Sequence, residues 1–419
     1  MHINSTYDLV IIGGGPAGMA AAMGARQNGV GDILILERED NMGGILQQCI
    51  HAGFGLHVFK EELTGPEYAH RYLQRIIESE IAMLTHACVL DIVTKDDASH
   101  ELYIAAPSIG LRTVQARAVI LAMGCRERTR QAIHIPGDRP SGIFTAGCAQ
   151  KMTNIMGYLP GKRIAILGSG DIGLIMARRL TLEGAEVVGV FELMPYSNGL
   201  TRNIVQCLDD YGIPLHLSTT VSQIYGGTRL TSMDVAPVDA NMKPILAQKR
   251  NISCDTLLLS IGLIPETELA IKLGITLHAR TKGPVVNSRL ETSVPGIFAC
   301  GNVLHVHDLV DFVTQESIRA GAAAAQWLQN PVPCQDDITI VPGQNVGYCL
   351  PGTISRGSAH TISLRVTKPI QGATLKLGDI LTKKLPIAIP SEMITFTISA
   401  DKLENIESHP LTLDVIANG

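Results

Sequence analysis

The chain has 419 residues, of which 46% are hydrophobic and 17% charged, a balance typical of a globular protein with two or three domains. Its net charge of −5 argues against nucleic acid or an anionic membrane as a partner. The nine cysteines are scattered without a Cys-x-x-Cys spacing, so we predict no metal site and no disulfide framework. No signal peptide is recognised at the start, and a reducing cytoplasm fits the cysteine usage best.

The first elements expected are a strand over 8–12, a glycine-rich turn, a helix ending near residue 27 and a strand over 32–36. The apolar block that opens this series is typical of a buried parallel strand. Gly13 permits the tight turn, Gly15 lets a pyrophosphate approach the backbone, and Gly18 lets the helix lie close to the sheet. The uncharged run over 9–25 is rich in glycine, so it predicts a buried strand and helix, not a membrane span.

Two further residues complete this first motif. Pro16 stands near the first helical position, where its missing N–H does no harm. Glu37 ends the second strand, where a carboxylate can accept the ribose hydroxyls. The order strand, turn, helix, strand and acid predicts a dinucleotide site, and the free N–H groups at the helix start would face its phosphates. An ordinary glycine-rich βα turn is the alternative interpretation.

The segment after Glu37 is harder to interpret. Residues 42–55 contain Gly44, Cys49 and His51 and are too rich in glycine for a plain helix, yet too apolar for a free loop. A helix is expected over 61–80, with Tyr68, Tyr72, Ile76 and Ile77 on one buried stripe. Strands follow near 83–94, 101–106 and 113–122, and the last of these ends at Ala122 and Gly124.

The first motif then repeats. A strand over 163–167 leads to a turn at Gly168, a helix ending near Glu183 and a strand ending at Glu192. The turn glycine, the glycine after the helix and the acid each recur 155 residues after their first copy. We therefore predict two copies of one dinucleotide-binding architecture.

The remaining segments predict that the chain returns to the first domain and then changes from an α/β pattern to an all-β pattern. A strand over 256–262 ends at Gly262, and a turn and strand over 292–302 end at Gly301 and Asn302. An alanine-rich helix is expected over 314–328. Prolines at 331 and 333 mark a linker, after which alternating segments predict a small all-β module.

These motifs resemble the two-dinucleotide-binding-domain flavoproteins of the pyridine nucleotide–disulfide oxidoreductase superfamily, over about residues 5–330. The resemblance implies that FAD binds at the first glycine motif and NAD(P)H at the second. It also implies that the 292–302 element helps to hold FAD, although Asn302 stands where the family usually has Asp. The FAD-binding set is then Gly13, Gly15, Pro16, Ala17, Gly18, Glu37, Arg38, Gly44, Ala122, Gly124, Gly301 and Asn302, and the NAD-binding set is Gly168, Gly170, Asp171, Ile172, Gly173, Glu192 and Gly262.

Three segments, 122–128, 142–147 and 301–311, are similar to a narrower subgroup. It includes subunits of opine-oxidase-like and hydrogen-cyanide-synthase-like dehydrogenases and proteins associated with glycerol-3-phosphate-dehydrogenase-like flavoproteins. The resemblance implies two partners, a small cysteine-rich protein and a second flavoprotein subunit, and we expect an oligomer. Glu192 favours NADH over NADPH, because a carboxylate bonds the ribose 2′-hydroxyl and repels a 2′-phosphate.

The chain departs from the disulfide reductases in its cysteines. One class carries Cys-x4-Cys just after the first acidic strand, where this sequence has only Cys49. The thioredoxin-reductase class carries Cys-x-x-Cys before the second glycine motif, where this sequence has only Cys148. Electrons therefore cannot leave the flavin through an ordinary dithiol.

The candidate catalytic residues are Cys49, His51, His305 and His307. We favour a buried apolar role for Cys49, with a redox thiol as the alternative. The histidines could handle protons beside a flavin. The run from His305 to Asp308 also has the composition of a zinc site, but flavin contact or helix capping is the favoured interpretation.

The sequence thus predicts an α/β protein with two Rossmann-like domains and a small all-β module. The expected segments are 1–150 and 285–335 for FAD, 151–284 for NAD, and 336–419 for the module. The favoured function is an FAD-dependent NADH oxidoreductase that serves a multi-component dehydrogenase as its electron-transfer subunit. The alternatives are a stand-alone NADH oxidase, peroxidase or disulfide reductase that uses Cys49, and a non-catalytic flavin-binding sensor or docking protein.

Overall fold

The computed structural model describes residues 3–404, 406 and 410–418. The chain forms two compact units: one combines the segments up to Cys125 and from Pro265 onward, and the other is the inserted segment Arg126–Ile264. Both limits of the inserted unit precede the boundaries expected at 150 and 284, and the four-segment division stays a prediction.

The first unit contains a parallel sheet with the strand order β5-β2-β1-β8-β19. Its central strand β1 pairs in register on both sides, Ile11 with Ile35 of β2 and with Ile120 of β8. The turn after β1 leads directly into helix α1, as the sequence predicted. The bounds are Thr6–Ile12 for β1, Pro16–Gln27 for α1, Ile33–Leu36 for β2, Ala82–Leu84 for β5, Gly110–Leu121 for β8 and Ile297–Ala299 for β19.

Two antiparallel strands, β6 (Cys88–Thr94) and β7 (His100–Ala106), extend this sheet from β8. Helix α2 spans Gly65–Glu78 and begins later than the sequence suggested, because Thr64 and Glu67 form a capping box at its start. Ile77 was expected in the core but is 51% exposed. It lies beside the stripe of Tyr68, Tyr72 and Ile76, which is buried.

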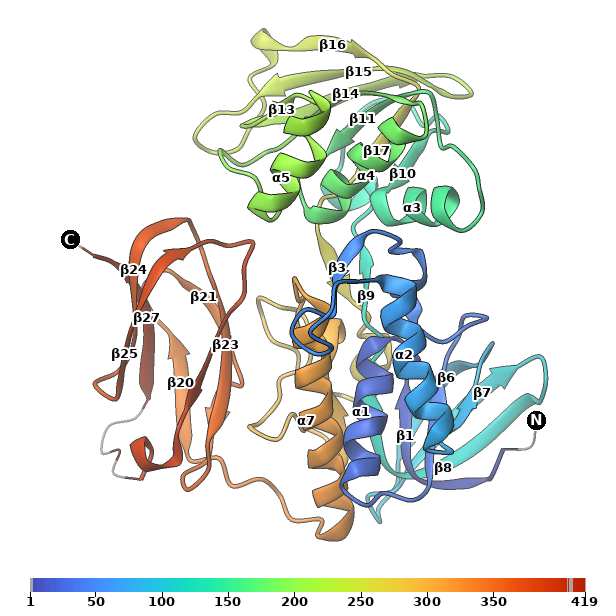
Figure 1. Ribbon diagram of the computed structural model, residues 1–419, viewed down its shortest axis with the longest axis vertical. Coiled ribbons are helices and arrows are strands. Elements are labelled where there is room, and N and C mark those ends of the chain that lie inside the picture. Colours follow the sequence, from blue (N-terminus) through green and yellow to red (C-terminus); the bar gives the residue numbers. More distant parts are fainter. Residues whose placement is uncertain (1–2, 405, 407–409, 419) are drawn as a thin grey trace. The chain divides into compact units, whose positions relative to one another are not determined.

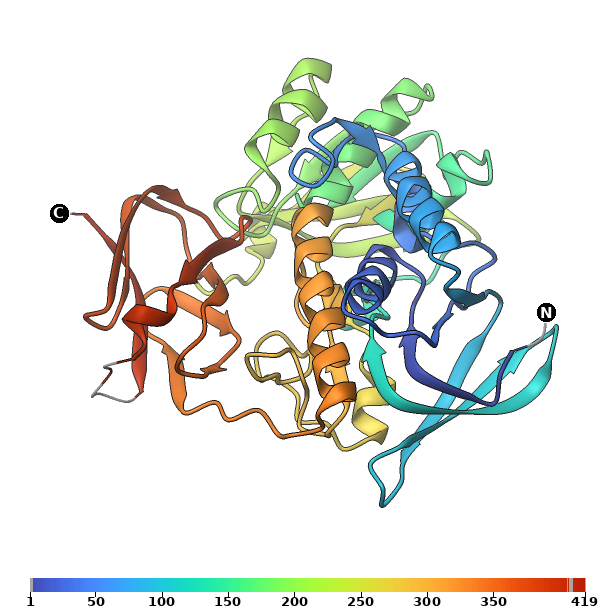
Figure 2. The same cartoon turned by 60° about the horizontal axis from the view of Figure 1, so that its bottom comes forward.

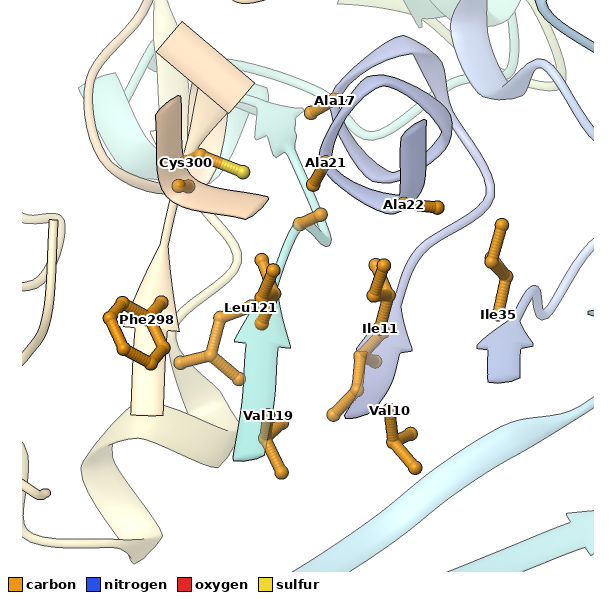
Figure 3. Packing of buried hydrophobic residues seen from close by; sticks show 14 of the residues in the cluster. Val10, Ile11, Ala17, Ala21, Ala22, Ile35, Val119, Leu121, Phe298 and Cys300 are labelled. Atoms are coloured by element: carbon orange, nitrogen blue, oxygen red, sulfur yellow. The ribbon is translucent and has the colours of Figure 1, made fainter. Parts of the chain in front are cut away.

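Helix α7 (Val310–Gln329) packs along α1, as Figures 1 and 2 both show. The contact is close because each helix presents a glycine: a Cβ on Gly24 would overlap the backbone of Ile318, and one on Gly321 would overlap that of Ala21. The helix begins at residue 310 instead of 314. Figure 3 shows part of the core under α1, where Ala21 of the helix lies toward Ile11 of β1, and Val10 and Val119 lie farther from the helix.

The second unit repeats the same plan. Its sheet is fully parallel, in the order β10-β17-β11-β12-β13, with Ile166 of β11 paired to Val190 and Leu258. An antiparallel meander of β14, β15 and β16 accompanies it. The bounds are Ile143–Thr145 for β10, Ala146–Asn154 for α3, Arg163–Leu167 for β11, Asp171–Leu182 for α4, Glu186–Phe191 for β12, Thr201–Cys207 for α5, Leu215–His216 for β13, Thr219–Gly226 for β14, Leu230–Pro237 for β15, Arg250–Ser253 for β16 and Thr256–Leu259 for β17.

The C-terminal region is all β, as predicted, and belongs to the first unit. Two sheets, β22-β20-β27-β24-β25 and β21-β23-β26, share a core of their own. Tyr348 and Leu350 of β21 instead join the large core of the first unit. The bounds are Ile338–Pro342 for β20, Val346–Leu350 for β21, Thr353–Ile354 for β22, His360–Val366 for β23, Ile370–Leu377 for β24, Leu381–Ala388 for β25, Ile394–Ile398 for β26 and Leu411–Ala417 for β27.

The remaining short elements are β3 (Ala52–Phe54), β4 (Leu63–Thr64), β9 (Cys125–Glu127), β18 (Leu263–Pro265) and α6 (Glu268–Lys272). No helix in the described part of the chain combines the length and hydropathy that crossing a bilayer requires.

Candidate functional site

The first glycine turn has the backbone that the sequence pattern predicted. Gly13 has φ +112°, and a Cβ there would overlap the carbonyl of Ala122 at the end of β8. A Cβ on Gly18 would overlap the carbonyl of Gly13, so α1 lies directly against the turn. Gly15 is the N-cap of α1, and a Cβ there would have only Gly44 Cα within 4 Å, at 3.9 Å. The turn is therefore open on the side where a phosphate would approach.

Glu37 holds this turn in place. Its buried carboxylate accepts the Gly14 N–H at 2.7 Å and the Glu39 N–H at 2.8 Å. Arg38, between them in sequence, is exposed. A carboxylate with two oxygens can accept further bonds while it keeps these two. Glu37 therefore can both brace the turn and bond a ribose.

Segments far apart in sequence converge on the turn. The Gly43 N–H donates to Gly14 O at 2.8 Å, which places Gly44 beside Gly15. A Cβ on Gly301 would lie 2.7 Å from the Ala17 methyl. The structure thus brings together most of the residues predicted for FAD, from the ends of β1, β8 and β19 and the start of α1.

Asn302 lies at this meeting point, in the short helix Gly301–Val303. Its side-chain oxygen accepts the His307 N–H at 3.0 Å. Within the described residues its amide nitrogen makes no hydrogen bond, so it is a donor that remains for a ligand hydroxyl or phosphate oxygen. An aspartate at this position would offer only acceptors, whereas the asparagine adds a hydrogen-bond donor.

The segment after Gly44 is tied to the start of α7. The buried carboxylate of Asp311 accepts three backbone N–H groups, from Gly55, His57 and Val58, at 2.8–3.2 Å. The His57 ring stacks on Phe312, with centroids 5.5 Å apart. Sequence reasoning missed Asp311, because its partners lie more than 250 residues away and leave no local pattern.

Cys49 and His51 lie in this same segment. The Cys49 thiol donates to Ile45 O at 3.3 Å, and burial raises its pKa to about 12. His51 packs on Phe54, with ring centroids 5.0 Å apart. Cys49 is therefore a protonated thiol at neutral pH in this structure.

The two other predicted histidines form a buried cluster with a residue that sequence reasoning did not identify. His305 Nε2 lies 2.7 Å from Glu316 Oε2 on α7, and His307 Nε2 lies 3.5 Å from the same oxygen. Asp308, the acid in the alternative zinc interpretation of this run, does not join them. Asp308 instead pairs with Arg365 of β23 and accepts the Met393 N–H at 2.7 Å, because it points toward the β-module.

The second glycine turn matches the first in detail. Gly168 has φ +93°, and a Cβ there would overlap the carbonyl of Ser260. Gly170 is the N-cap of α4, and the Gly173 N–H donates to Ser260 Oγ at 3.2 Å. Glu192 is buried, and it accepts the Ser169 N–H and hydroxyl at 2.9 and 2.6 Å.

Other residues predicted for NAD have structural contacts of their own. The Asp171 carboxylate accepts the Leu200 N–H at 2.8 Å and the Asn203 side-chain amide at 2.6 Å, so it fixes the start of α5. Ile172 packs against the core of the second unit. Gly262 has φ +100° and accepts the Arg128 N–H at 3.0 Å.

Two glycine turns, each at the end of a central parallel strand and each braced by an acid from the next strand, define a protein with two dinucleotide-binding domains. A family model described as pyridine nucleotide-disulphide oxidoreductase matches residues 7–327, and the chain belongs to this family. Members of this family are FAD-dependent NAD(P)H oxidoreductases. This confirms the oxidoreductase class and the two cofactors predicted from the sequence.

Known relatives agree with this family. An opine oxidase subunit of Agrobacterium tumefaciens is 25% identical over 320 residues, which cover 72% of this chain and 62% of the relative. The hydrogen cyanide synthase subunit HcnB of Pseudomonas protegens is 25% identical over 318 residues, which cover 70% and 65%. The matches thus span less than two thirds of either relative. Among solved structures, the thioredoxin reductase of T. acidophilum has a TM-score of 0.63 at 22% identity, covering 77% of this chain and 99% of that one, and shows the fold.

Proposed function

We propose that the chain passes hydride between NADH and FAD, and that it serves as an electron-transfer subunit of a multi-component dehydrogenase. The observation that carries this proposal is the pair of intact, equally braced dinucleotide turns in a chain without a dithiol at either position used by disulfide reductases. When bound, FAD supplies the hydride chemistry, and the protein supplies binding and alignment.

The residues proposed to hold FAD act mainly through backbone. The turn Gly13–Gly18 would bind the pyrophosphate at the start of α1. The first hydrogen bond within the helix runs from the Met19 N–H to Gly15 O, so the N–H groups before Met19 have no partner inside the helix and can donate to the phosphates. Glu37 would bond the ribose, and the Asn302 amide would donate to a flavin-chain hydroxyl. Gly44 and Gly301 let their segments approach the turn closely, because a Cβ on either would press against Gly15 or Ala17.

The second turn is proposed to hold NADH in preference to NADPH. Glu192 stands at the end of β12 with its carboxylate buried, and the next residues, Leu193 and Met194, carry no charge. The 2′-phosphate of NADPH would lie against this carboxylate, and the residues that follow Glu192 supply no cation to offset the repulsion. The preference for NADH follows from that repulsion.

Cys49 bears on where electrons go after the flavin. A redox thiol needs its thiolate form, and a pKa of about 12 keeps Cys49 protonated at neutral pH. This supports the transfer of electrons from the flavin to a second redox centre instead of to the sulfur of Cys49. The opine oxidase and hydrogen cyanide synthase relatives are named as subunits, and a partner flavoprotein and a small cysteine-rich protein are the proposed acceptors or donors.

One experiment separates this proposal from a stand-alone NADH oxidase, peroxidase or disulfide reductase. The FAD-loaded chain is titrated anaerobically with NADH while the flavin spectrum is followed, for the native chain, for Cys49→Ser and for Cys88→Ser as an exposed control. We expect full flavin reduction in all three and no thiolate charge-transfer band.

Two results would overturn the proposal. A charge-transfer band that disappears only in Cys49→Ser, together with rapid turnover on peroxide or oxygen, would establish the stand-alone enzyme. Tight FAD binding without any reduction by NADH would instead favour a sensor or docking protein.

A further inference from the structure

Three side chains with metal-ligand chemistry meet in the interior of the first unit. His305 and His307 come from the loop after Asn302, and Glu316 comes from the second turn of α7. The His305 and His307 Nε2 atoms lie 2.7 and 3.5 Å from Glu316 Oε2, and the cluster brings one ligand atom from each residue within 4.8 Å of the others. Their side chains are 0%, 2% and 5% exposed.

The spacing of these atoms suits a small cation. Bonds of roughly 2.0–2.2 Å from zinc to nitrogen and oxygen place neighbouring ligand atoms about 3–4 Å apart in a tetrahedral site. The distance from Glu316 Oε2 is 3.5 Å to His307 Nε2, inside that range, and 2.7 Å to His305 Nε2, just below it, so a small movement of the side chains would bring both into the range. The donor set of two imidazoles and one carboxylate is one that Zn²⁺ accepts.

Two of the three ligand side chains, Glu316 and His305, are already oriented by other contacts. The second oxygen of Glu316 accepts the Gly301 N–H at 2.8 Å. The other ring nitrogen of His305 faces the Tyr348 hydroxyl at 3.3 Å, and Asn302 fixes the backbone of His307. Hydrogen bonds of this outer kind commonly set the ring orientation and the tautomer of metal-bound histidine.

One member of the cluster, Glu316, borders a cavity. The cavity has a volume of about 100 Å³, with Arg319, His360 and Ser363 also in its wall. This is large enough for several water molecules. The nearby acid Asp308 is occupied by Arg365 and leaves Glu316 as the carboxylate of the cluster.

We propose that His305, His307 and Glu316 bind one divalent cation of the zinc class through their Nε2, Nε2 and Oε2 atoms, with water from the adjacent cavity as the fourth ligand. The ion would tie the loop that follows Asn302 to helix α7. A bound cation would also balance the negative charge of the buried Glu316 carboxylate.

The test starts from the metal content of the full, tag-free chain with FAD bound, purified from zinc-supplemented medium and dialysed into metal-free buffer. Elemental analysis is expected to give about one zinc per chain, as for a site built into the fold. X-ray absorption at the zinc edge should show nitrogen and oxygen neighbours without sulfur, which separates this site from the nine cysteines.

Variants locate the site. His307→Gln and Glu316→Gln should lower the zinc content at least about tenfold, and Tyr348→Phe should weaken zinc affinity about tenfold or more by releasing the His305 ring. His360→Gln is the matched control, because it lines the same cavity but bonds Ser355 and Ser358 instead of the cluster.

Zinc-free native chain that is folded and loaded with FAD would overturn the proposal and leave a hydrogen-bonded His–Glu–His cluster. Sulfur among the zinc neighbours, or zinc retained in His307→Gln, would overturn it as well. If the Glu316 variant does not fold, the zinc content and absorption spectrum of the native chain still decide the question.

Discussion

Glu37 and Glu192 lie 155 residues apart and make the same contacts. Each carboxylate accepts the N–H of the second residue of its glycine turn, Gly14 or Ser169, with one oxygen. Each accepts the N–H two residues further along its own chain with the other, at Glu39 or Met194. The two acids therefore have a structural role in the turn in addition to any bond with a ribose.

The first prediction concerns the choice of nicotinamide cofactor. Glu192→Gln keeps the shape of the side chain and removes the charge that would repel a 2′-phosphate. We expect the ratio of kcat/KM for NADH over NADPH to fall about tenfold, equivalent to one charged contact. The rate of flavin reduction in stopped flow measures it. Glu186→Gln, on the same strand but exposed, should leave the ratio unchanged, and an unchanged ratio in the Glu192 variant would contradict the assignment.

The second prediction concerns the first glycine turn. Gly13→Ala combines a φ of +112° with overlap between the new methyl and the carbonyl of Ala122, a strain of about 1–3 kcal/mol or more. The bound FAD per chain should fall severalfold, as read from flavin absorbance against protein. Gly31→Ala is the control, because its methyl would have no atom within 4 Å. Equal FAD content in both variants would show that the turn tolerates a side chain.

The third prediction concerns how the β-module is attached. Arg365 is 17% exposed, pairs with Asp308, and donates to Val306 O at 3.0 Å and Pro390 O at 2.8 Å. Removing one partner of a fully buried pair commonly costs about 3–5 kcal/mol, and this part-buried pair belongs at the lower end of that range. Arg365→Met should therefore lower the free energy of unfolding by about 3 kcal/mol in denaturant titration.

The partner variant completes this third prediction. In a double-mutant cycle, Arg365→Met and Asp308→Asn together should cost clearly less than the sum of the two single variants, because they remove the same interaction. Additive effects would mean that the two side chains are not coupled. Glu186→Gln, which breaks an exposed pair with Arg163, should cost no more than about 1 kcal/mol.

The fourth prediction concerns pH. His100 is fully buried in β7, and burial lowers its pKa to about 4. Below about pH 6.5 the unfolded chain takes up a proton that the folded chain does not accept until about pH 4, so stability falls as the pH drops through this window. The loss attributable to His100 is about 3 kcal/mol between about pH 7 and pH 4.

A comparison of variants separates the pH-dependent loss of stability caused by His100 from the loss caused by protonation of carboxylates. His100→Gln should unfold at a midpoint temperature that declines less between about pH 7 and pH 4.5 than that of the native chain. His86→Gln, an exposed position, should follow the native chain. Parallel curves for the native chain and His100→Gln would show that the imidazole is protonated in the folded state.

Sequence reasoning worked where the chemistry is local. The turn glycines, the helix that follows and the acid at the end of the next strand are close together in sequence, and their conformational needs are specific enough to be recognised. The constant offset of 155 added the second copy. The alternation of apolar and polar residues likewise indicated that the C-terminal region is all β.

It failed where a contact depends on the tertiary structure. Asp311 accepts backbone N–H groups that lie more than 250 residues earlier in the chain. Glu316 on α7 bonds His305 in the preceding loop, 11 residues earlier. Asp308 follows His307 directly, yet it pairs with Arg365, 57 residues later. A buried polar side chain takes whichever partner the tertiary structure brings, and neither spacing nor residue type identifies that partner.

The way α7 completes the first unit has a consequence for synthesis on the ribosome. Strand β19 and helix α7 are needed to finish the sheet and to cover α1, and they follow the whole of the inserted unit. A chain that grows from its N-terminus can therefore close the second dinucleotide fold while the first is still missing its last strand and its covering helix. The strands and helix translated first are among the last to become fully buried, and during that interval the apolar face of α1 is open to chaperones and to unwanted association.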